Sequence, residues 1–220
     1  MTGYAFLAET ADSYSRLIAA DSGGDIVSVI CSDPERQPWD VALLGVFARR
    51  IGGARRVLDV GCGPGQMTAL LAGLGVDAFG IDLAPGMVER ARRDHPELRF
   101  EVGSMLDLDL PDASVDGILA CYSIIHVPHE LRPQVFAEFF RVLAPGGGLM
   151  LIFQVGDEVS RRTEAFGMPI AIDWYRQQPA DLAELLRSAG FELSFQGVRA
   201  PENGEKTPHG YLIAVRPAAA

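Results

Sequence analysis

Two aspartates flank a glycine-rich segment near the first third of the chain. Asp59 ends a short apolar run, the segment GCGPG (61–65) follows it, and Asp82 comes later, at the end of a second apolar run. A glycine loop between a strand and a helix exposes backbone N–H groups to a nucleotide at close range. A dinucleotide loop would carry its third glycine at position 66, where this chain has Gln66. The segment therefore favours a nucleoside ligand and disfavours a pyrophosphate.

The two carboxylates restrict the ligand further. The charge of Asp59 would oppose a pyrophosphate and attract a cationic group. Asp82 occupies the position from which an acid accepts hydrogen bonds from ribose hydroxyls. The set favours a ribonucleoside with a positively charged arm and no diphosphate, and S-adenosylmethionine meets these conditions. An NAD-dependent oxidoreductase, the third hypothesis, would need glycine in place of Gln66.

The elements that would position these residues alternate regularly from residue 55 onward. Strands are predicted at 55–60, 76–83, 98–104, 115–123 and 149–155, and helices at 66–74, 84–94, 130–143 and 180–189. This alternation predicts an α/β fold with a Rossmann-like, doubly wound, mostly parallel sheet. The late apolar segments FELSFQGVRA and YLIAVRP predict an antiparallel C-terminal hairpin at one edge, which makes the sheet seven-stranded.

Two segments lie outside this alternation. Helical patterns at 5–20 and 38–51 predict that residues 1–54 form a helical N-terminal cap. Residues 55–220 would form the Rossmann-like domain, with 156–178 as a lid insertion. Both extra segments can cover the carboxyl edge of the sheet, where open α/β sheets bind ligands.

Composition excludes several classes of function. The 19 basic and 29 acidic residues give a formal charge of −10, which disfavours nucleic acid and anionic membrane surfaces as partners. Cys31, Cys62 and Cys121 show no paired spacing, so neither a disulfide framework nor a structural metal is expected. The N-terminus lacks the features of a signal peptide, and no apolar run reaches the length of a membrane span. We expect a reduced, cytoplasmic monomer or homodimer.

Four segments resemble the motifs of class I S-adenosylmethionine-dependent methyltransferases, in the order of that family. They are VLDVGCGPG (57–65), GIDLAPGMVERAR (80–92), VGSMLDLDLPDASVDGIL (102–119) and RVLAPGGGLMLIF (141–153). TADSY (10–14) and the tail GEKTPHGYLIAVRP resemble bacterial small-molecule methyltransferases of this class. The resemblance implies an enzyme of EC 2.1.1 type that methylates an O, N or C atom of a small metabolite, such as a natural product, and leaves S-adenosylhomocysteine.

The resemblance also assigns roles to individual cofactor-binding residues. Those expected at the methionine end are Asp59, Gly61, Cys62, Gly63, Cys121 and Tyr122. Asp82 would hold the ribose, and the residues expected around the adenine are Leu83, Met87, Ser104 and Met105. The family usually has Asp where this chain has Ser104, and Tyr14 would lie over the cofactor.

The acceptor side is less determined by the sequence. A base is needed only if the acceptor must lose a proton, and His126 is the candidate, either as that base or as a residue that lines the site. His129 is expected to be an exposed residue at the start of a helix. In the lid, Phe166, Met168, Trp174 and Tyr175 either bind a flat or apolar acceptor or pack the lid onto the sheet.

Two further interpretations remain open at this point. Asp157 and Glu158 are expected to be solvated loop charges. The alternatives are that they pair with Arg161 or Arg162, that they attract a cationic acceptor, or that they bind a metal. The second hypothesis for the whole chain is a cofactor-binding regulatory or partner subunit without turnover. Ser104 and the lack of an obvious base motivate that hypothesis.

Overall fold

The fold is built on a seven-stranded sheet. A computed structural model describes residues 4–21, 26–27, 37–53, 55–202 and 204–218. The sheet order is β3-β2-β1-β4-β5-β9-β8, made of β1 Arg56–Val60, β2 Asp77–Asp82, β3 Arg99–Val102, β4 Val115–Cys121, β5 Leu143–Gln154, β8 Glu192–Arg199 and β9 His209–Val215. Strands β1 to β5 pair in parallel, whereas β9 is antiparallel to both β5 and β8. The predicted α/β sheet with an antiparallel C-terminal edge is confirmed.

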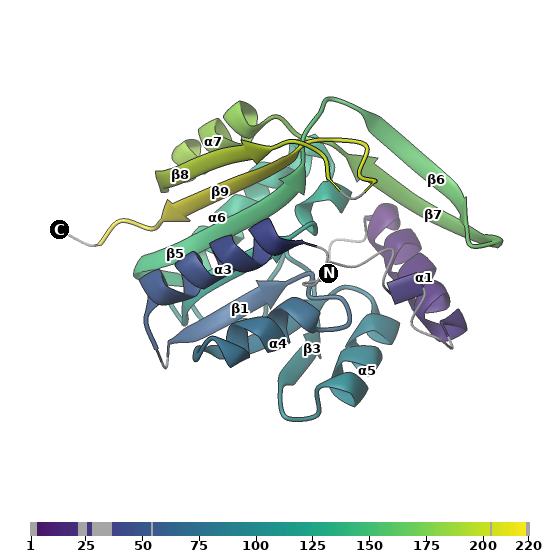
Figure 1. The fold of residues 1–220 in the computed structure, drawn as a ribbon, viewed down its shortest axis with the longest axis horizontal. Coiled ribbons are helices and arrows are strands. Elements are labelled where there is room, and N and C mark those ends of the chain that lie inside the picture. Colours follow the sequence, from purple (N-terminus) through teal and green to yellow (C-terminus); the bar gives the residue numbers. More distant parts are fainter. Residues whose placement is uncertain (1–3, 22–25, 28–36, 54, 203, 219–220) are drawn as a thin grey trace.

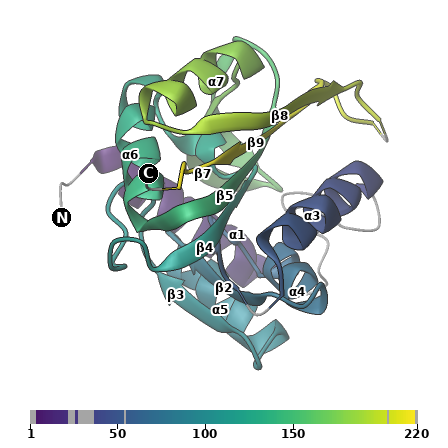
Figure 2. The same cartoon turned by 90° about the vertical axis from the view of Figure 1, so that its left-hand side faces the viewer.

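Helices cover both faces of this sheet (Figure 2). They are α3 Pro38–Ile51, α4 Gln66–Gly73, α5 Pro85–Asp94, α6 Arg132–Val142 and α7 Pro179–Ser188. On one face Phe47 of α3 and Leu71 of α4 pack on the sheet, and on the other Phe139 of α6 and Leu186 of α7 do so. All four side chains are almost fully buried. The helix at 38–51 thus covers the sheet beside β5 instead of its carboxyl edge.

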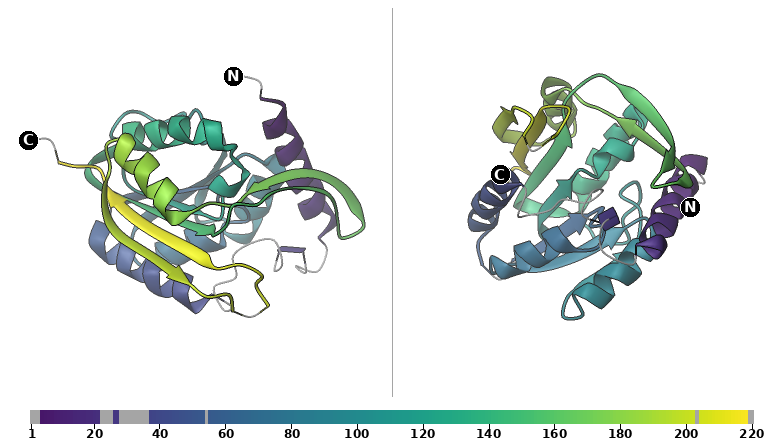
Figure 3. Two further views of the ribbon diagram at one scale, coloured as in Figure 1. Left: turned by 90° about the horizontal axis from the view of Figure 1, so that it is seen from above. Right: turned by 45° about the vertical axis from the view of Figure 1, so that its right-hand side comes forward.

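A second layer lies beyond the carboxyl edge of the sheet (Figure 1). It contains helix α1 Ala5–Ala20 and a two-stranded antiparallel hairpin of β6 Val159–Ala165 and β7 Met168–Tyr175. The sequence analysis predicted a lid at 156–178 but no strands within it. The hairpin extends away from the main sheet and runs alongside α1 (Figure 3).

Polar contacts join α1 to this hairpin. The amide of Ala171 donates to Ser13 Oγ at 2.9 Å, and Arg161 forms ion pairs with Glu9 and Asp173. Helix α1 also packs against α5 at the edge of the main domain. Helix α1, which precedes the sheet in sequence, and the hairpin inserted between β5 and α7 therefore form one cover.

Three further properties concern the cysteines, the helices and the metal-binding side chains. Cys62 and Cys121 form no disulfide with each other, and Cys31 lies outside the described residues. Within the described ranges, no helix has the length and apolarity that crossing a membrane requires. The same part of the chain has no cluster of three or more His, Cys, Asp or Glu side chains suited to a metal ion.

Candidate active site

A cavity of about 400 Å³ opens where β1, β2 and β4 end, beneath α1 and the hairpin. Every residue assigned to the site from the sequence lines it: Tyr14, Asp59, Gly61, Cys62, Gly63, Asp82, Leu83, Met87, Ser104, Met105, Cys121, Tyr122 and His126. These positions span 113 residues of sequence (14 to 126), and the topology places them around one space.

The glycine loop between β1 and α4 bends through left-handed backbone conformations. Gly61, Gly63 and Gly65 have φ angles of 73°, 54° and 89°, which favour glycine strongly. A Cβ atom on Gly61 would lie 2.3 Å from the Cβ of Ser123, so the loop also needs glycine for close packing. The amides of Gly61 and Cys62 both donate to the carbonyl of Ile81, at 2.7 and 3.1 Å. This packing ties the loop to the ends of β2 and β4.

Asp82 braces the same loop from the end of β2. Its Oδ2 accepts from the amide of Gly63 and its Oδ1 from the amide of Ala84, both at 2.8 Å. Burial raises the pKa of Asp82, and these backbone donors oppose that shift. Each carboxylate oxygen has a second lone pair. Asp82 can therefore accept from ribose hydroxyls while it holds the loop.

Asp59 carries one of the buried polar atoms of the site that lack a hydrogen-bond partner among the described residues. Its side chain is 1% exposed, and Oδ2 accepts from the hydroxyl of Thr68 at 2.7 Å. Oδ1 has no hydrogen-bond partner among the described residues. Burial, together with the charge of Asp82, raises the pKa of Asp59 to about 7. A cationic group in the cavity would satisfy Oδ1 and restore the ionised form, so the site fits the ammonium of S-adenosylmethionine.

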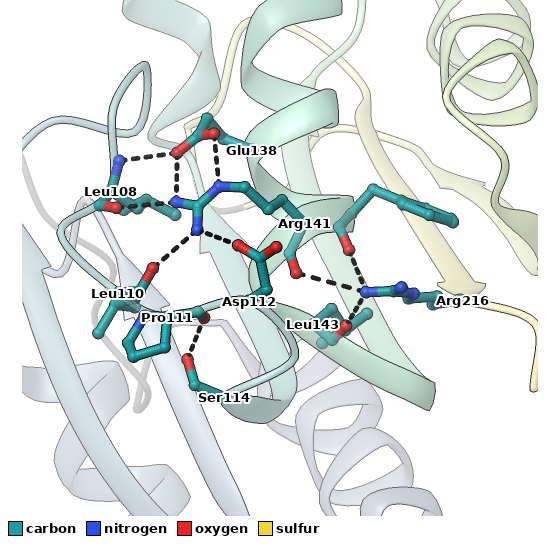
Figure 4. A network of polar contacts seen from close by, with 10 residues as sticks. Leu108, Leu110, Pro111, Asp112, Ser114, Glu138, Arg141, Leu143 and Arg216 are labelled. Atoms are coloured by element: carbon teal, nitrogen blue, oxygen red, sulfur yellow. Dashed lines mark hydrogen bonds and ion pairs between the residues drawn. The ribbon is translucent and has the colours of Figure 1, made fainter.

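The segment after β3 carries the residues expected beside the adenine. The amide of Leu106 donates to Ser104 Oγ at 3.2 Å, which leaves the hydroxyl proton of Ser104 available to a ligand. Arg141 of α6 anchors the following loop by donating to the carbonyls of Leu108 and Leu110 at 2.9 and 2.8 Å (Figure 4). The same guanidinium pairs with Glu138. Arg141 thus supports one wall of the cavity from the opposite face of the loop.

His126 lies at the boundary between the sheet edge and the cover. It belongs to a 3-10 turn, Ile124–His126, and both ring nitrogens are engaged. Nδ1 lies 3.0 Å from the carbonyl oxygen of Asp173, and Nε2 lies 3.0 Å from the hydroxyl of Tyr14. Because a carbonyl only accepts, Nδ1 carries the proton and Nε2 accepts from Tyr14. Desolvation lowers the pKa of His126 to about 4, so the ring is neutral at pH 7.

The part of the cavity beyond His126 is mostly apolar, although Thr10 of α1 and the charged residues Arg162 and Glu164 of the hairpin also line the cavity. Its wall from α1 and the hairpin includes Phe6, Leu7, Leu17, Phe166, Ile170, Ile172 and Trp174. Of the four lid residues named from the sequence, Phe166 and Trp174 line the cavity. Met168 packs against a small core beside α1, and the ring of Tyr175 lies 5.6 Å from that of the exposed His129.

The two acidic residues directly after β5 lie outside the cavity. Asp157 and Glu158 are exposed, in line with solvated loop charges. Asp157 accepts from the side-chain amide of Gln178 at 3.0 Å, and Glu158 pairs with Arg176. The alternative that they pair with Arg161 or Arg162 is therefore wrong, since Arg161 binds Glu9 and Asp173 instead.

Several polar residues of the cavity wall were not predicted from the sequence, and three of them lie together near Tyr122. Gln37, Gln154 and His209 line the cavity near Tyr122. They come from the start of α3, the end of β5 and the start of β9, and none lies in the four motifs. The only sequence signal for them was the tail segment that contains His209.

A Rossmann-like sheet with an acid, a glycine loop and a second acid at its carboxyl edge defines a nucleoside-binding enzyme domain. Residues 57–147 match a methyltransferase domain family. The chain is 30% identical over 205 residues to "O-methyltransferase cnsE" of Penicillium expansum, covering 84% of this chain and 70% of that protein. The chain belongs to the class I S-adenosylmethionine-dependent methyltransferases, and S-adenosylmethionine is its cofactor.

Two further similarities agree with this assignment. A ubiquinone biosynthesis O-methyltransferase of Xanthomonas axonopodis pv. citri is 33% identical over 172 residues, which cover 70% of this chain and 69% of that protein. The solved structure of a DhpI–SAH complex covers 100% of both chains with a TM-score of 0.73 at 22% identity, which shows a shared fold. The relatives carry enzyme names and give no support to a subunit without turnover.

Proposed function

We propose that this methyltransferase modifies a small, flat and largely apolar molecule that binds beneath α1 and the β6–β7 hairpin. The observation that carries the proposal is one continuous cavity, lined at one end by the glycine loop and both acids and at the other by a mostly apolar wall that also carries Arg162 and Glu164. Aromatic residues with a few polar groups are typical of small-molecule sites. The formal charge of −10 argues against nucleic acid or an anionic membrane as the acceptor. We assign no metal to the reaction.

We propose the following roles for the cofactor side of the cavity. Asp59 receives the ammonium group, Asp82 the ribose hydroxyls, and the backbone of Gly61 to Gly63 passes under the methionine moiety. The residues proposed around the adenine are Leu83, Met87, Ser104 and Met105. The cofactor supplies a methyl group activated by its sulfonium sulfur, so the remaining task of the protein is to position the acceptor in line with it.

We infer that His126 acts as a general base towards a hydroxyl acceptor. An acceptor hydroxyl would replace the hydroxyl of Tyr14 at Nε2 and pass its proton there. Its oxygen would bond to the methyl carbon while the bond from that carbon to the sulfonium sulfur breaks, which leaves S-adenosylhomocysteine. The carbonyl of Asp173 holds Nδ1–H and thereby keeps the Nε2 lone pair towards the cavity. A pKa of about 4 makes His126 a weak base, which suits an acidic hydroxyl such as a phenol better than an aliphatic alcohol. The names of the two O-methyltransferase relatives support transfer to oxygen.

The test is transfer of labelled methyl groups from S-adenosylmethionine to matched phenols, aliphatic alcohols and amines. We expect turnover with phenols, and His126→Gln should lower it by about 100-fold at pH 7, the lower range for loss of a general base. The loss should shrink near pH 10, where a phenol ionises without help. His129→Gln, an exposed histidine nearby, is the matched control. Unchanged turnover in His126→Gln would refute the base, and transfer to none of these acceptors would refute the small-molecule proposal.

A further inference from the structure

A buried polar network lies behind the methionine end of the cavity. Its members are Asp40 of α3, Tyr122 after β4, Arg199 of β8, Glu205, and His209 and Tyr211 of β9. Asp40 is at the centre and is fully buried. Its Oδ2 accepts from Tyr122 at 3.0 Å and its Oδ1 from Tyr211 at 2.6 Å. The network therefore joins α3 to the β4 end and to the antiparallel edge of the sheet.

The donors and acceptors of this network follow from Arg199, which can only donate. Its Nε donates to the Tyr211 oxygen at 2.7 Å and its Nη2 to His209 Nδ1 at 3.0 Å. The carboxylate of Glu205 accepts hydrogen bonds from both Nη groups of Arg199. Nδ1 of His209 is thus an acceptor, and its protonated Nε2 lies 3.5 Å from Glu205.

Tyr122 and His209 are the members that line the cavity, and Tyr122 is the one that adjoins the glycine loop through its neighbour Ser123. Its hydroxyl donates its single proton to Asp40 Oδ2 at 3.0 Å and lies 2.5 Å from His209 Nδ1, so the phenol oxygen is fixed between these two side chains. Its backbone adopts a φ of 49°, a left-handed conformation that is unusual for a residue other than glycine. The Tyr122 amide still donates to the carbonyl of Ile152 at 2.8 Å. The anchored side chain and this backbone bond together hold the turn that ends β4.

This turn controls the glycine loop through one contact. Ser123 follows Tyr122 and packs so closely on Gly61 that a Cβ there would lie 2.3 Å from the Ser123 Cβ. Rotation of the Tyr122 backbone towards an ordinary conformation would move Ser123 against or away from Gly61. The placement of Gly61 therefore depends on the hydroxyl anchor of Tyr122.

We propose that the network of Asp40, Tyr122, Arg199, Glu205, His209 and Tyr211 positions the methionine end of the cofactor site, with Tyr122 as the positioning residue. The hydroxyl of Tyr122 acts through the turn and Ser123, and it donates its own hydrogen bond to Asp40 beside His209. The inference rests on the proposed placement of the cofactor, in which the glycine loop carries the methionine moiety. It gives the C-terminal segment around His209 and Tyr211 a role in cofactor binding.

The test compares two ligands that differ only at the methionine end. S-adenosylhomocysteine carries the amino-acid group, and 5′-methylthioadenosine keeps the adenosine and the thioether but lacks that group. We expect Tyr122→Phe to lower the affinity for S-adenosylhomocysteine, measured by calorimetry, about three- to tenfold, which is the effect of one lost hydrogen bond. Binding of 5′-methylthioadenosine should stay within about twofold. Tyr175→Phe, a half-buried tyrosine of the hairpin, is the matched control and should change neither.

The outcomes separate the inference from the placement on which it rests. Unchanged S-adenosylhomocysteine affinity in Tyr122→Phe, or an equal loss for both ligands, would overturn the inference. Wild-type protein that binds both ligands with equal affinity would overturn the placement itself. If Tyr122→Phe does not fold, Tyr211→Phe removes the other hydroxyl on Asp40, and the same selective loss is expected from it.

Discussion

The pH dependence of ligand binding at Asp59 tests the cofactor site. Burial disfavours the ionised carboxylate in the empty protein, whereas an ammonium group of the ligand requires it. Its buried Oδ1 has no partner among the described residues, and its pKa is raised to about 7. An ammonium group at Oδ1 would lower that pKa. Binding therefore releases a proton from Asp59 below pH 7, and affinity should rise with pH up to about 7 and then level off.

The size of the effect follows from the difference in pKa between the empty and the bound protein. If the ligand returns Asp59 to its ordinary value of 3.8, affinity should change almost tenfold per pH unit between that value and about 7. Calorimetry with S-adenosylhomocysteine at pH 5 and pH 8 should show affinities that differ by up to about 100-fold. Asp59→Asn should bind weakly at both pH values, with a flat profile.

The ionised form of Asp59 should have the opposite effect on stability: it favours ligand binding but destabilises the empty protein. An aspartate whose folded pKa lies above its unfolded value stabilises the fold at low pH, and this contribution is lost as the pH rises from the unfolded pKa through the folded one. At pH 8 the ionised Asp59 therefore costs the empty protein stability, by up to a few kcal/mol. Asp59→Asn should raise the melting temperature of the empty protein at pH 8, although it lowers the affinity for S-adenosylhomocysteine. A variant that melts lower at pH 8 and retains the wild-type pH profile of binding would refute the reasoning.

The other predictions concern separate parts of the cavity. Asp82→Ala should weaken the binding of S-adenosylhomocysteine by about 1–3 kcal/mol, measured by calorimetry, because the variant lacks the carboxylate that accepts from the ribose and from the Gly63 amide. Gly61→Ala should abolish that binding, because its Cβ would lie 2.3 Å from the Ser123 Cβ, and Ser123→Gly in the same chain should restore it only in part. Arg141→Met should lower stability to denaturant by about 1–2 kcal/mol by releasing the loop at Leu108 and Leu110, an effect limited by the partial exposure of Arg141. Trp174→Ala should raise the acceptor KM about tenfold or more, while the affinity for S-adenosylhomocysteine stays unchanged.

The sheet and the cofactor residues could be predicted because their signals are local. Strand, glycine loop and helix follow one another between Arg55 and Gly75, and parallel topology then brings the carboxyl ends of β1, β2 and β4 together. Asp59 and Asp82 could thus be placed at one edge without any knowledge of distant contacts. The hydrogen bonds of Asp82 to the loop follow from the same neighbourhood.

The cover could be predicted only in outline, because its contacts are made between distant segments. The β6–β7 hairpin carries charged residues on an exposed strand, so its pattern lacks the apolar alternation of a buried strand. Its position depends on pairs such as Ala171 with Ser13, which lie far apart in sequence. The helix at 38–51 has the same composition whether it covers the sheet or the cavity, and only its contact with β5 distinguishes the two. Asp40 and Tyr211 illustrate the same limit, since each reads as an ordinary surface or strand residue by itself.

The short segment from Tyr122 to His126 connects the sheet to the cover formed by α1 and the hairpin. At its first residue the side chain is anchored to Asp40 and His209, on the side of the sheet covered by α3. At its last residue the side chain is anchored to Tyr14 and Asp173, on the cover. The cofactor end and the acceptor end of the cavity are therefore separated by one segment that is held at both ends. Because methyl transfer depends on a close and aligned approach of the acceptor, changes at either anchor should alter the rate of transfer more than the stability of the fold.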